Sequence, residues 1–278
     1  MKIVDSHQHF WKYNPATLPW ITDSLHQLKR DFLPSDLKRI YTEHNISGCI
    51  AVQAAQTVEE TRFLLSLAES NPFIKGVVGW IDLKSNALSD ALNEFESFEK
   101  LKGFRHILQD ESDPYYISDP NFQRGLDVIF CRGYTYDILV FPSQLRGALD
   151  TVSRFPNARF VIDHLAKPNI EHKSINDWRN LMVEFRGFPN VFCKLSGMVT
   201  ESDWKDWKKE DFFPYIDVMM DVFGEDRLMF GSDWPVCLLA ASFGEVKGVI
   251  EAYLSNFPKS VQEKIWSANA LKFYQINS

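Results

Sequence analysis

Short apolar segments rich in β-branched residues alternate along the chain with longer segments whose apolar residues follow helical spacing. The first pattern predicts buried strands, and the second predicts amphipathic helices. The strand segments recur roughly every 32 residues, which is the length of a strand–helix–strand unit. We predict eight strands, at residues 3–9, 48–54, 76–82, 103–108, 135–140, 159–164, 191–196 and 228–233.

The helical segments carry signals of their own. Apolar stripes with helical spacing are clearest over residues 88–98, 122–130 and 246–257. Thr57 with Glu60 resembles a capping box, and Asp119 precedes Pro120 as an N-cap residue would. Strands that alternate with helices pair in parallel, and eight such units can close into a ring. The pattern therefore predicts an α/β protein, a single-domain (β/α)8 TIM barrel over residues 1–278.

Composition makes several classes of function unexpected. The formal net charge is −7 over 278 residues, so binding to a polyanion such as nucleic acid is not expected. No apolar stretch approaches the length of a membrane span, and only two apolar residues lie between Lys2 and Asp5, too few for a signal-peptide core. The four cysteines are far apart beside apolar segments, which suits a reducing compartment. We expect a cytoplasmic enzyme, and exposed aromatic residues would also suit a homo-oligomer.

Polar residues recur where the predicted strands end, at the face of a barrel where active sites are built. They are His7 and His9, Gln53, Arg105 and His106, Tyr136 and Asp137, Asp163 and His164, Lys194 and Ser196, and Asp233. A single histidine there would more often be a core residue. The convergence of several imidazoles with one carboxylate instead favours a catalytic site, because buried charge is costly without a role or a partner.

Strand alternation assigns these residues to faces. Asp5, His7 and His9 are expected to point one way, into a common site. Asp163 precedes His164 and is expected to face the other side, where it would cap a helix or pair with a base. Arg105 and His106 are neighbours, so only one of them can point inward, and the sequence leaves open which one does.

Three long connections follow the first, fourth and seventh predicted strands, at residues 10–31, 110–119 and 200–211. Loops in these places line the mouth of a barrel, so they are candidate lids. The first contains Trp11 and Trp20, and the third contains Trp204. These rings could stack on a ring-shaped ligand or could simply anchor the loops on the barrel.

Five segments together resemble the amidohydrolase superfamily, and within it the sugar-lactonase branch. They are His7-Gln8-His9, Gly103-Phe104-Arg105-His106, Asp163-His164-Leu165-Ala166-Lys167-Pro168, Lys194-Leu195-Ser196-Gly197 and Gly231-Ser232-Asp233-Trp234-Pro235. The first segment alone is weak evidence, but the combination in this order is specific. The resemblance implies a hydrolase that opens a cyclic ester, with Asp233 activating water beside His7, His9 and His164.

The same resemblance bears on metal binding. Two-metal members of the superfamily have a histidine on the fifth strand and a bridging lysine or glutamate on the fourth. This chain has Tyr136 and Asp137 on the fifth strand and Arg105 on the fourth, and a fixed cation opposes a metal pair. A set of three imidazoles and one carboxylate could hold a single Zn²⁺ ion, namely His7, His9, His164 and Asp233. We expect that no metal is required, with a single zinc ion as the alternative.

The candidate binding residues favour a neutral sugar lactone. A pyrone dicarboxylate would need several cations near the mouth, and few are available. Groups that bind hydroxyls or stack on rings are more plentiful: Gln53, Arg105, His106, Tyr136, Asp137, Lys194, Trp11, Trp20 and Trp234. We expect a sugar γ-lactone such as L-fucono- or L-rhamnono-lactone as the substrate. The alternatives are a metal-dependent decarboxylase of the same superfamily and a non-catalytic carbohydrate-binding barrel.

Overall fold

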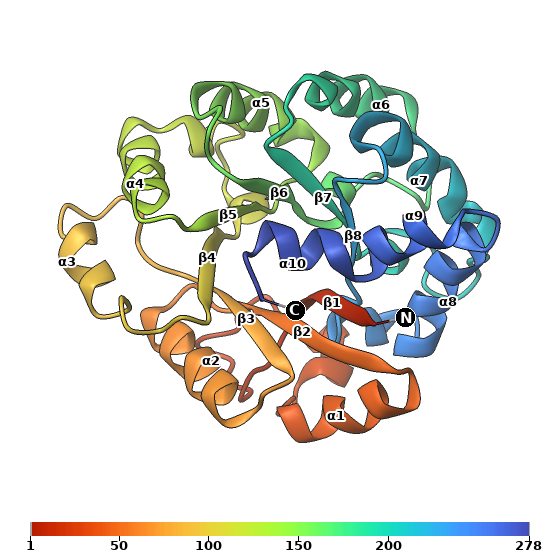
Figure 1. Ribbon diagram of the computed structural model, residues 1–278, viewed down its shortest axis with the longest axis horizontal. Helices are drawn as coiled ribbons and strands as arrows, with labels where there is room; N and C mark the ends of the chain where they lie inside the picture. The colour runs from red at the N-terminus through yellow and green to blue at the C-terminus, as the bar shows by residue number, and fades with distance from the viewer. Residues whose placement is uncertain (1, 278) are drawn as a thin grey trace.

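The computed structural model describes residues 2–277 and shows a barrel of eight parallel strands surrounded by helices (Figure 1). The strands follow one another around the barrel in chain order. They are β1 Ile3–Gln8, β2 Ile46–Val52, β3 Ile74–Gly79, β4 Leu101–His106, β5 Thr135–Ile138, β6 Phe160–Ile162, β7 Val191–Leu195 and β8 Leu228–Phe230. The ring closes beyond β8, where Asp233 N donates to His7 O at 2.8 Å and His9 N donates to Trp234 O at 2.7 Å. The predicted (β/α)8 barrel is confirmed.

A helix follows each strand. The helices are α1 Pro34–Glu43, α2 Val58–Ser70, α3 Leu88–Asn93, α4 Pro120–Cys131, α5 Leu145–Arg154, α6 Asn176–Val183, α7 Lys209–Phe223 and α8 Phe243–Leu254, with α9 Lys259–Glu263 and α10 Asn269–Phe273 at the C-terminal end. Thr57 caps α2 and Asp119 caps α4 through their side chains, as predicted. The stripe over residues 88–98 forms a shorter helix than expected, because α3 ends at Asn93.

Two of the predicted strands end early at places where the backbone soon turns left-handed. The strand predicted at 159–164 stops at Ile162, and the next four residues after Asp163 have φ values of 51° to 56°. The strand predicted at 228–233 stops at Phe230, and Asp233 has φ of 58°. Left-handed backbone is sterically costly for residues with a Cβ atom, so surrounding contacts must hold it. Both deviations occur at candidate site residues.

The interior of the barrel has an apolar lower layer and a charged upper layer. The lower layer contains the inward side chains Val4, Ile50, Val161, Phe192 and Met229. The residues Ala270, Phe273 and Tyr274 pack against this layer, and α10 lies across this end of the barrel in Figure 1. The upper layer contains His7, Arg105, Asp137, Asp163 and Lys194, all at most 4% exposed. The C-terminal segment thus closes one end of the barrel, and the charged layer lies toward the other.

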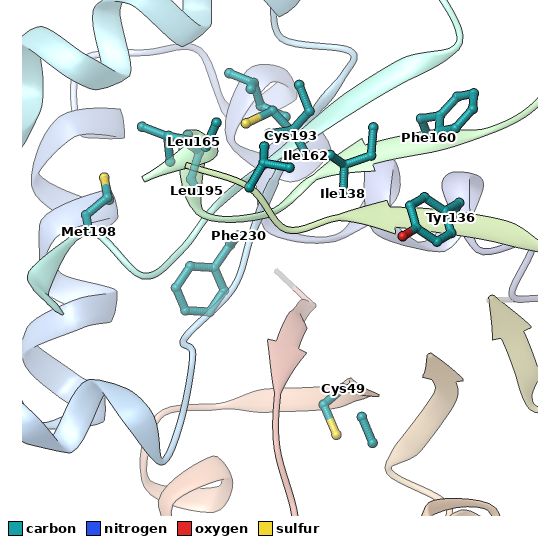
Figure 2. Packing of buried hydrophobic residues seen from close by; sticks show 14 of the residues in the cluster. Cys49, Tyr136, Ile138, Phe160, Ile162, Leu165, Cys193, Leu195, Met198 and Phe230 are labelled. Carbon is teal, nitrogen blue, oxygen red and sulfur yellow. The ribbon is translucent and has the colours of Figure 1, made fainter. Parts of the chain in front are cut away.

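Outward strand residues form a second core against the helices. Figure 2 shows part of it, where Ile138, Ile162 and Cys193 of three adjacent strands lie together. All four cysteines are free thiols, and Cys131 is exposed, whereas the other three are buried. Within residues 2–277, no helix is long and apolar enough to cross a membrane.

Candidate active site

Strand β1 brings His7 and His9 to the site, but it does not bring Asp5. The pairing of β1 with β2 shifts register between Asp5 and Gln8, so side-chain alternation is broken there. The Asp5 carboxylate accepts from Tyr41 Oη at 2.9 Å, on α1, and from Ser232 N at 2.8 Å. Burial raises the pKa of Asp5 to about 6. The expectation that Asp5 shares a face with the two histidines is wrong; Asp5 joins β1 to α1 and to the segment after β8.

Three imidazoles surround one oxygen of Asp233. The distances from Asp233 Oδ1 to the Nε2 atoms are 3.4 Å for His9, 3.8 Å for His7 and 3.9 Å for His164. Burial favours a protonated Asp233, but His164, His9 and His7 outweigh it and hold the pKa of Asp233 below its usual range. Burial lowers the pKa of His164 to about 4 and the pKa of His7 well below its usual value. Asp233 is therefore ionised at neutral pH, as a general base must be.

The far nitrogens of these imidazoles have partners that fix the rings. His9 Nδ1 lies 2.8 Å from Val52 O, and a carbonyl only accepts, so Nδ1 carries the proton. The Nε2 lone pair of a neutral His9 then faces Asp233 Oδ1, another acceptor. Two acceptors in contact need a donor or a cation between them. The arrangement suits a water molecule, a shared proton or a metal ion.

One divalent ion fits three of the four predicted ligands, without His9. His7, His164 and Asp233 each offer a ligand atom within 4.8 Å of the others, and all three are buried. His164 Nδ1 lies 2.8 Å from Ser196 Oγ, a contact of the kind that orients metal-binding histidines. Arg105 opposes the ion, because its Nη1 lies 3.2 Å from His7 Nε2 and a guanidinium can only donate. Arg105 thus competes for the lone pair that a metal would need.

Arg105, not His106, points into the barrel. Its Nε and Nη2 donate to Gln53 Oε1 at 3.0 and 2.8 Å, and its Nη1 donates to Asp163 Oδ2 at 3.0 Å. His106 points outward, where its Nε2 lies 2.8 Å from Glu111 Oε1 and its ring stacks on Tyr116. Alternation along β4 had left these two residues open, and the contacts of Arg105 decide between them.

A buried ion network lies beneath the imidazoles. Lys194 Nζ contacts Asp137 Oδ2 at 2.5 Å, Asp163 Oδ1 at 3.0 Å and His7 Nδ1 at 3.1 Å, and all four side chains have no exposed surface. Burial raises the pKa of Asp137 to about 6 against the pull of Lys194. Burial acts on Asp163 too, but Lys194, His7 and Arg105 together hold its pKa well below the usual range.

Asp163 therefore pairs with basic side chains, which is one of the two roles that the sequence predicted for it; the other was a helix cap. The expectation that it faces away from the site is wrong. Strand β6 ends at Ile162, and Asp163 begins the left-handed turn, so strand alternation does not relate it to His164. Both side chains reach the interior of the barrel, His164 at the pocket and Asp163 below it.

A pocket of about 270 Å³ opens above this floor, close to the lower end of the roughly 300–1,000 Å³ typical of ligand sites. Five of the predicted site residues line it: His9, Trp20, Arg105, His164 and Asp233. Four others are buried behind or beneath these: His7, Gln53, Asp137 and Lys194. The structure therefore places most predicted polar residues in one cluster, of which only the upper members reach the pocket.

The remaining predicted residues lie outside the pocket lining. Tyr136 faces outward from β5 and packs edge-on against Phe122 of α4 at 6.0 Å. Trp11 donates to Arg30 O at 2.9 Å, and Trp234 packs edge-on against Phe32 at 5.3 Å. Trp11 thus anchors the loop after β1, which is the second interpretation that the sequence allowed for the loop aromatics, whereas Trp234, predicted to bind substrate, packs at the end of that loop.

The pocket wall contains polar residues that the strand-end pattern did not single out for binding. They are Gln109, Asp110, Lys167, Thr200 and Glu201, together with Trp204. Gln109, Asp110, Thr200 and Glu201 lie in single 3₁₀ turns of the connections, which are too short for alternation or helical spacing to show. The available signals were the three long connections, each of which contributes to the wall. Lys167 pairs with Glu201 at 3.3 Å, and Trp204 is 40% exposed.

Comparisons with known proteins agree with this architecture. The chain is 39% identical to an L-fucono-1,5-lactonase of Burkholderia multivorans, over 98% of this chain and 96% of that protein. It is 25% identical to an L-rhamnono-gamma-lactonase of Scheffersomyces stipitis, over 85% of this chain and 77% of that protein. A crystal structure of a Burkholderia multivorans amidohydrolase with bound zinc superimposes with a TM-score of 0.96 at 38% identity, covering all of both chains.

More distant structures share the fold alone. A 2,6-dihydroxybenzoate decarboxylase aligns over 99% of both chains with a TM-score of 0.68 but is only 13% identical. The family model described as amidohydrolase matches residues 4–276, nearly the whole chain. Together with the full-length relatives, this match shows that the chain belongs to the amidohydrolase family.

Proposed function

We propose that this protein is a hydrolase that opens the ring of a sugar lactone, with L-fucono-lactone or L-rhamnono-lactone as the first candidates. The observation that carries the proposal is the position of the Asp233 carboxylate at the pocket floor, where the Nε2 atoms of three imidazoles lie 3.4–3.9 Å from its Oδ1. The names of the relatives supply the substrate class. The expected partner is therefore a small sugar lactone.

The chemistry follows from the placement of the side chains. Asp233 accepts a proton from water while the water oxygen bonds to the lactone carbonyl carbon. The carbonyl oxygen gains negative charge, which the Arg105 guanidinium and His164 stabilise from the pocket floor, whereas the unprotonated Nε2 of a neutral His9 can only accept, for example from the attacking water. The bond from that carbon to the ring oxygen then breaks, and protonated Asp233 returns its proton to the departing oxygen. His7 acts from beneath, through its contact with Asp233.

The required rate acceleration is within reach of these groups. Proton transfer by a positioned carboxylate contributes roughly 10²–10⁴ in rate, and one preorganised donor to the developing oxyanion contributes about 10²–10³. A lactone is an activated ester, so it needs less assistance than an amide. His7, His164 and Asp233 would hold a divalent ion, which when bound would polarise a carbonyl oxygen as a Lewis acid. We propose that the reaction does not require this ion, because Arg105 already supplies positive charge at that point.

A panel of sugar lactones in weakly buffered pH indicator tests the proposal, since hydrolysis releases one acid per ring. We expect turnover of L-fucono- and L-rhamnono-lactone. Release of carbon dioxide from an aromatic acid, without lactone opening, would instead support the decarboxylase alternative. Binding of a lactone without acid release would support the non-catalytic barrel.

A further inference from the structure

We propose that Glu60 is a positioning residue for substrate binding, because it fixes a corner of the chain from which two pocket-lining side chains are held. The corner consists of residues 53–55, directly after β2. Glu60 itself does not line the pocket, so any effect on the substrate must pass through the corner. This inference rests on the proposed function, and it adds a residue that neither the motifs nor the strand ends single out.

The Glu60 carboxylate accepts from two consecutive backbone groups of the corner. Its Oε2 accepts from Ala55 N at 2.9 Å, and its Oε1 accepts from Ala54 N. Both alanines are only 3% exposed, so water cannot readily replace this acceptor. The sequence predicted a capping box at this helix start. Only half of it forms, since Thr57 Oγ1 accepts from Glu60 N at 3.1 Å while the carboxylate binds the corner instead.

The corner in turn holds Arg105 and Trp20, which arrive from different parts of the chain. Gln53 binds Arg105 through its side-chain oxygen, at 3.0 and 2.8 Å, and also through its backbone oxygen. Ala54 O accepts from Trp20 Nε1 at 3.0 Å. Both Arg105 and Trp20 line the pocket, one in the floor and one in the wall. A displaced corner would therefore move two contact surfaces of the substrate together.

The charge of Glu60 is part of this arrangement. Burial raises the pKa of Glu60 to about 7, while the two backbone N–H groups and Arg105 lower it. An ionised carboxylate offers acceptors to both N–H groups, whereas an amide of the same size offers one oxygen and an NH₂ group that faces a donor. Glu60→Gln is thus a small change in shape that removes one of the two acceptors for Ala54 N and Ala55 N. We call this pair of hydrogen bonds the Glu60 clamp.

The experiment compares Glu60→Gln with Glu59→Gln in steady-state hydrolysis of the lactone that the wild type turns over best. Glu59 is the adjacent acid, exposed and paired with Arg62 at 3.1 Å on the surface. We expect Glu60→Gln to raise KM through Trp20 and to lower kcat through Arg105, so that kcat/KM falls about tenfold or more, and Glu59→Gln to change neither. An unchanged kcat/KM in Glu60→Gln, or a loss of activity that the loss of folded protein fully accounts for, would overturn the proposal.

Two further measurements keep the test decisive. Trp20→Phe removes the N–H group that binds Ala54 O and keeps an aromatic ring. If one corner serves both residues, the combined effect of Glu60→Gln and Trp20→Phe on KM is smaller than the product of the single effects; a full product contradicts the proposal. Amide hydrogen exchange at Ala54 and Ala55 should be at least tenfold faster in Glu60→Gln. That measurement needs no substrate, so a chain inactive on all lactones would refute the proposed function and still allow the clamp to be tested.

Discussion

The floor and the wall of the pocket are built in different ways. The floor consists of residues on the strands or directly after them, whose charged groups contact one another, as in the buried cluster of Lys194, Asp137 and Asp163. The wall consists largely of loop residues with few mutual contacts, such as the pair Lys167–Glu201 and the 40% exposed Trp204. Electrostatic interactions are strong in a buried floor and weak at an exposed wall. Floor residues should therefore govern folding and kcat, and wall residues should govern KM.

The largest expected effect on catalysis is at Asp233. Asp233→Asn keeps the shape but removes the acceptor for the proton of water, so kcat should fall about 10²- to 10⁴-fold with little loss of folded protein. Asp226→Asn is the control, because Asp226 lies exposed in a surface pair with Lys264 at 2.8 Å. Steady-state kinetics and thermal unfolding measure the two properties. A fully active Asp233→Asn variant would refute the proposed base.

Lys194 tests the stability of the floor. Lys194→Met leaves Asp137 and Asp163 without their main cation, and removal of one partner from a buried ion cluster typically costs about 3–5 kcal/mol. We expect the free energy of unfolding, measured with denaturant, to fall by about that amount. Lys264→Met is a matched control, since Lys264 also contacts two carboxylates but at the surface, and it should cost less than about 1 kcal/mol. Equal costs at both sites would mean that burial does not distinguish floor from surface.

A substitution at Gly197 tests how closely His164 must be positioned beside Asp233. A Cβ atom at Gly197 would lie 2.5 Å from His164 Nδ1, and the φ of 62° is unfavourable for any other residue. Gly197→Ala should displace His164 from Asp233 and lower kcat about 10- to 100-fold. Gly187→Ala should have no such effect, because nothing lies within 4 Å of a Cβ atom built there. An unchanged kcat in Gly197→Ala would show that His164 need not hold its position.

The same contrast explains what the sequence could predict. Alternation holds in β7, where the inward Lys194 lies between the outward Cys193 and Leu195, because β7 is a regular strand that pairs with β6 and β8. It fails at Asp5 and Asp163, where a bulge and a left-handed turn break the period. These irregularities depend on partners distant in the chain, such as Ser232 for Asp5. The wall escapes prediction for a related reason, since loop residues follow no period at all.

A smaller effect is expected at the wall. Trp204 lines the pocket with part of its ring exposed, and stacking on a sugar ring contributes about 1 kcal/mol, or roughly fivefold in affinity. Trp204→Ala should raise KM about fivefold and leave kcat nearly unchanged. Tyr115→Ala is the control, because Tyr115 is 51% exposed and lies outside the pocket lining. A fall in kcat with constant KM would mean that Trp204 acts on the chemical step, as a floor residue does, and not on substrate binding.

The smallest effect on kcat is expected from metal removal. This experiment distinguishes most sharply between a floor that works through Arg105 and one that works through a bound ion. The floor has a set of ligand atoms that fits a divalent ion. Arg105 Nη1, however, lies 3.2 Å from His7 Nε2, where it competes with an ion for the lone pair of that nitrogen. If the guanidinium supplies the positive charge for the carbonyl oxygen, prolonged chelation should change kcat by less than about twofold. Arg105→Met should then lower kcat far more than chelation does. Loss of activity in chelator that Zn²⁺ restores would instead mean that the ion displaces Arg105 from His7, and that the imidazoles serve as metal ligands rather than as direct contacts of the substrate.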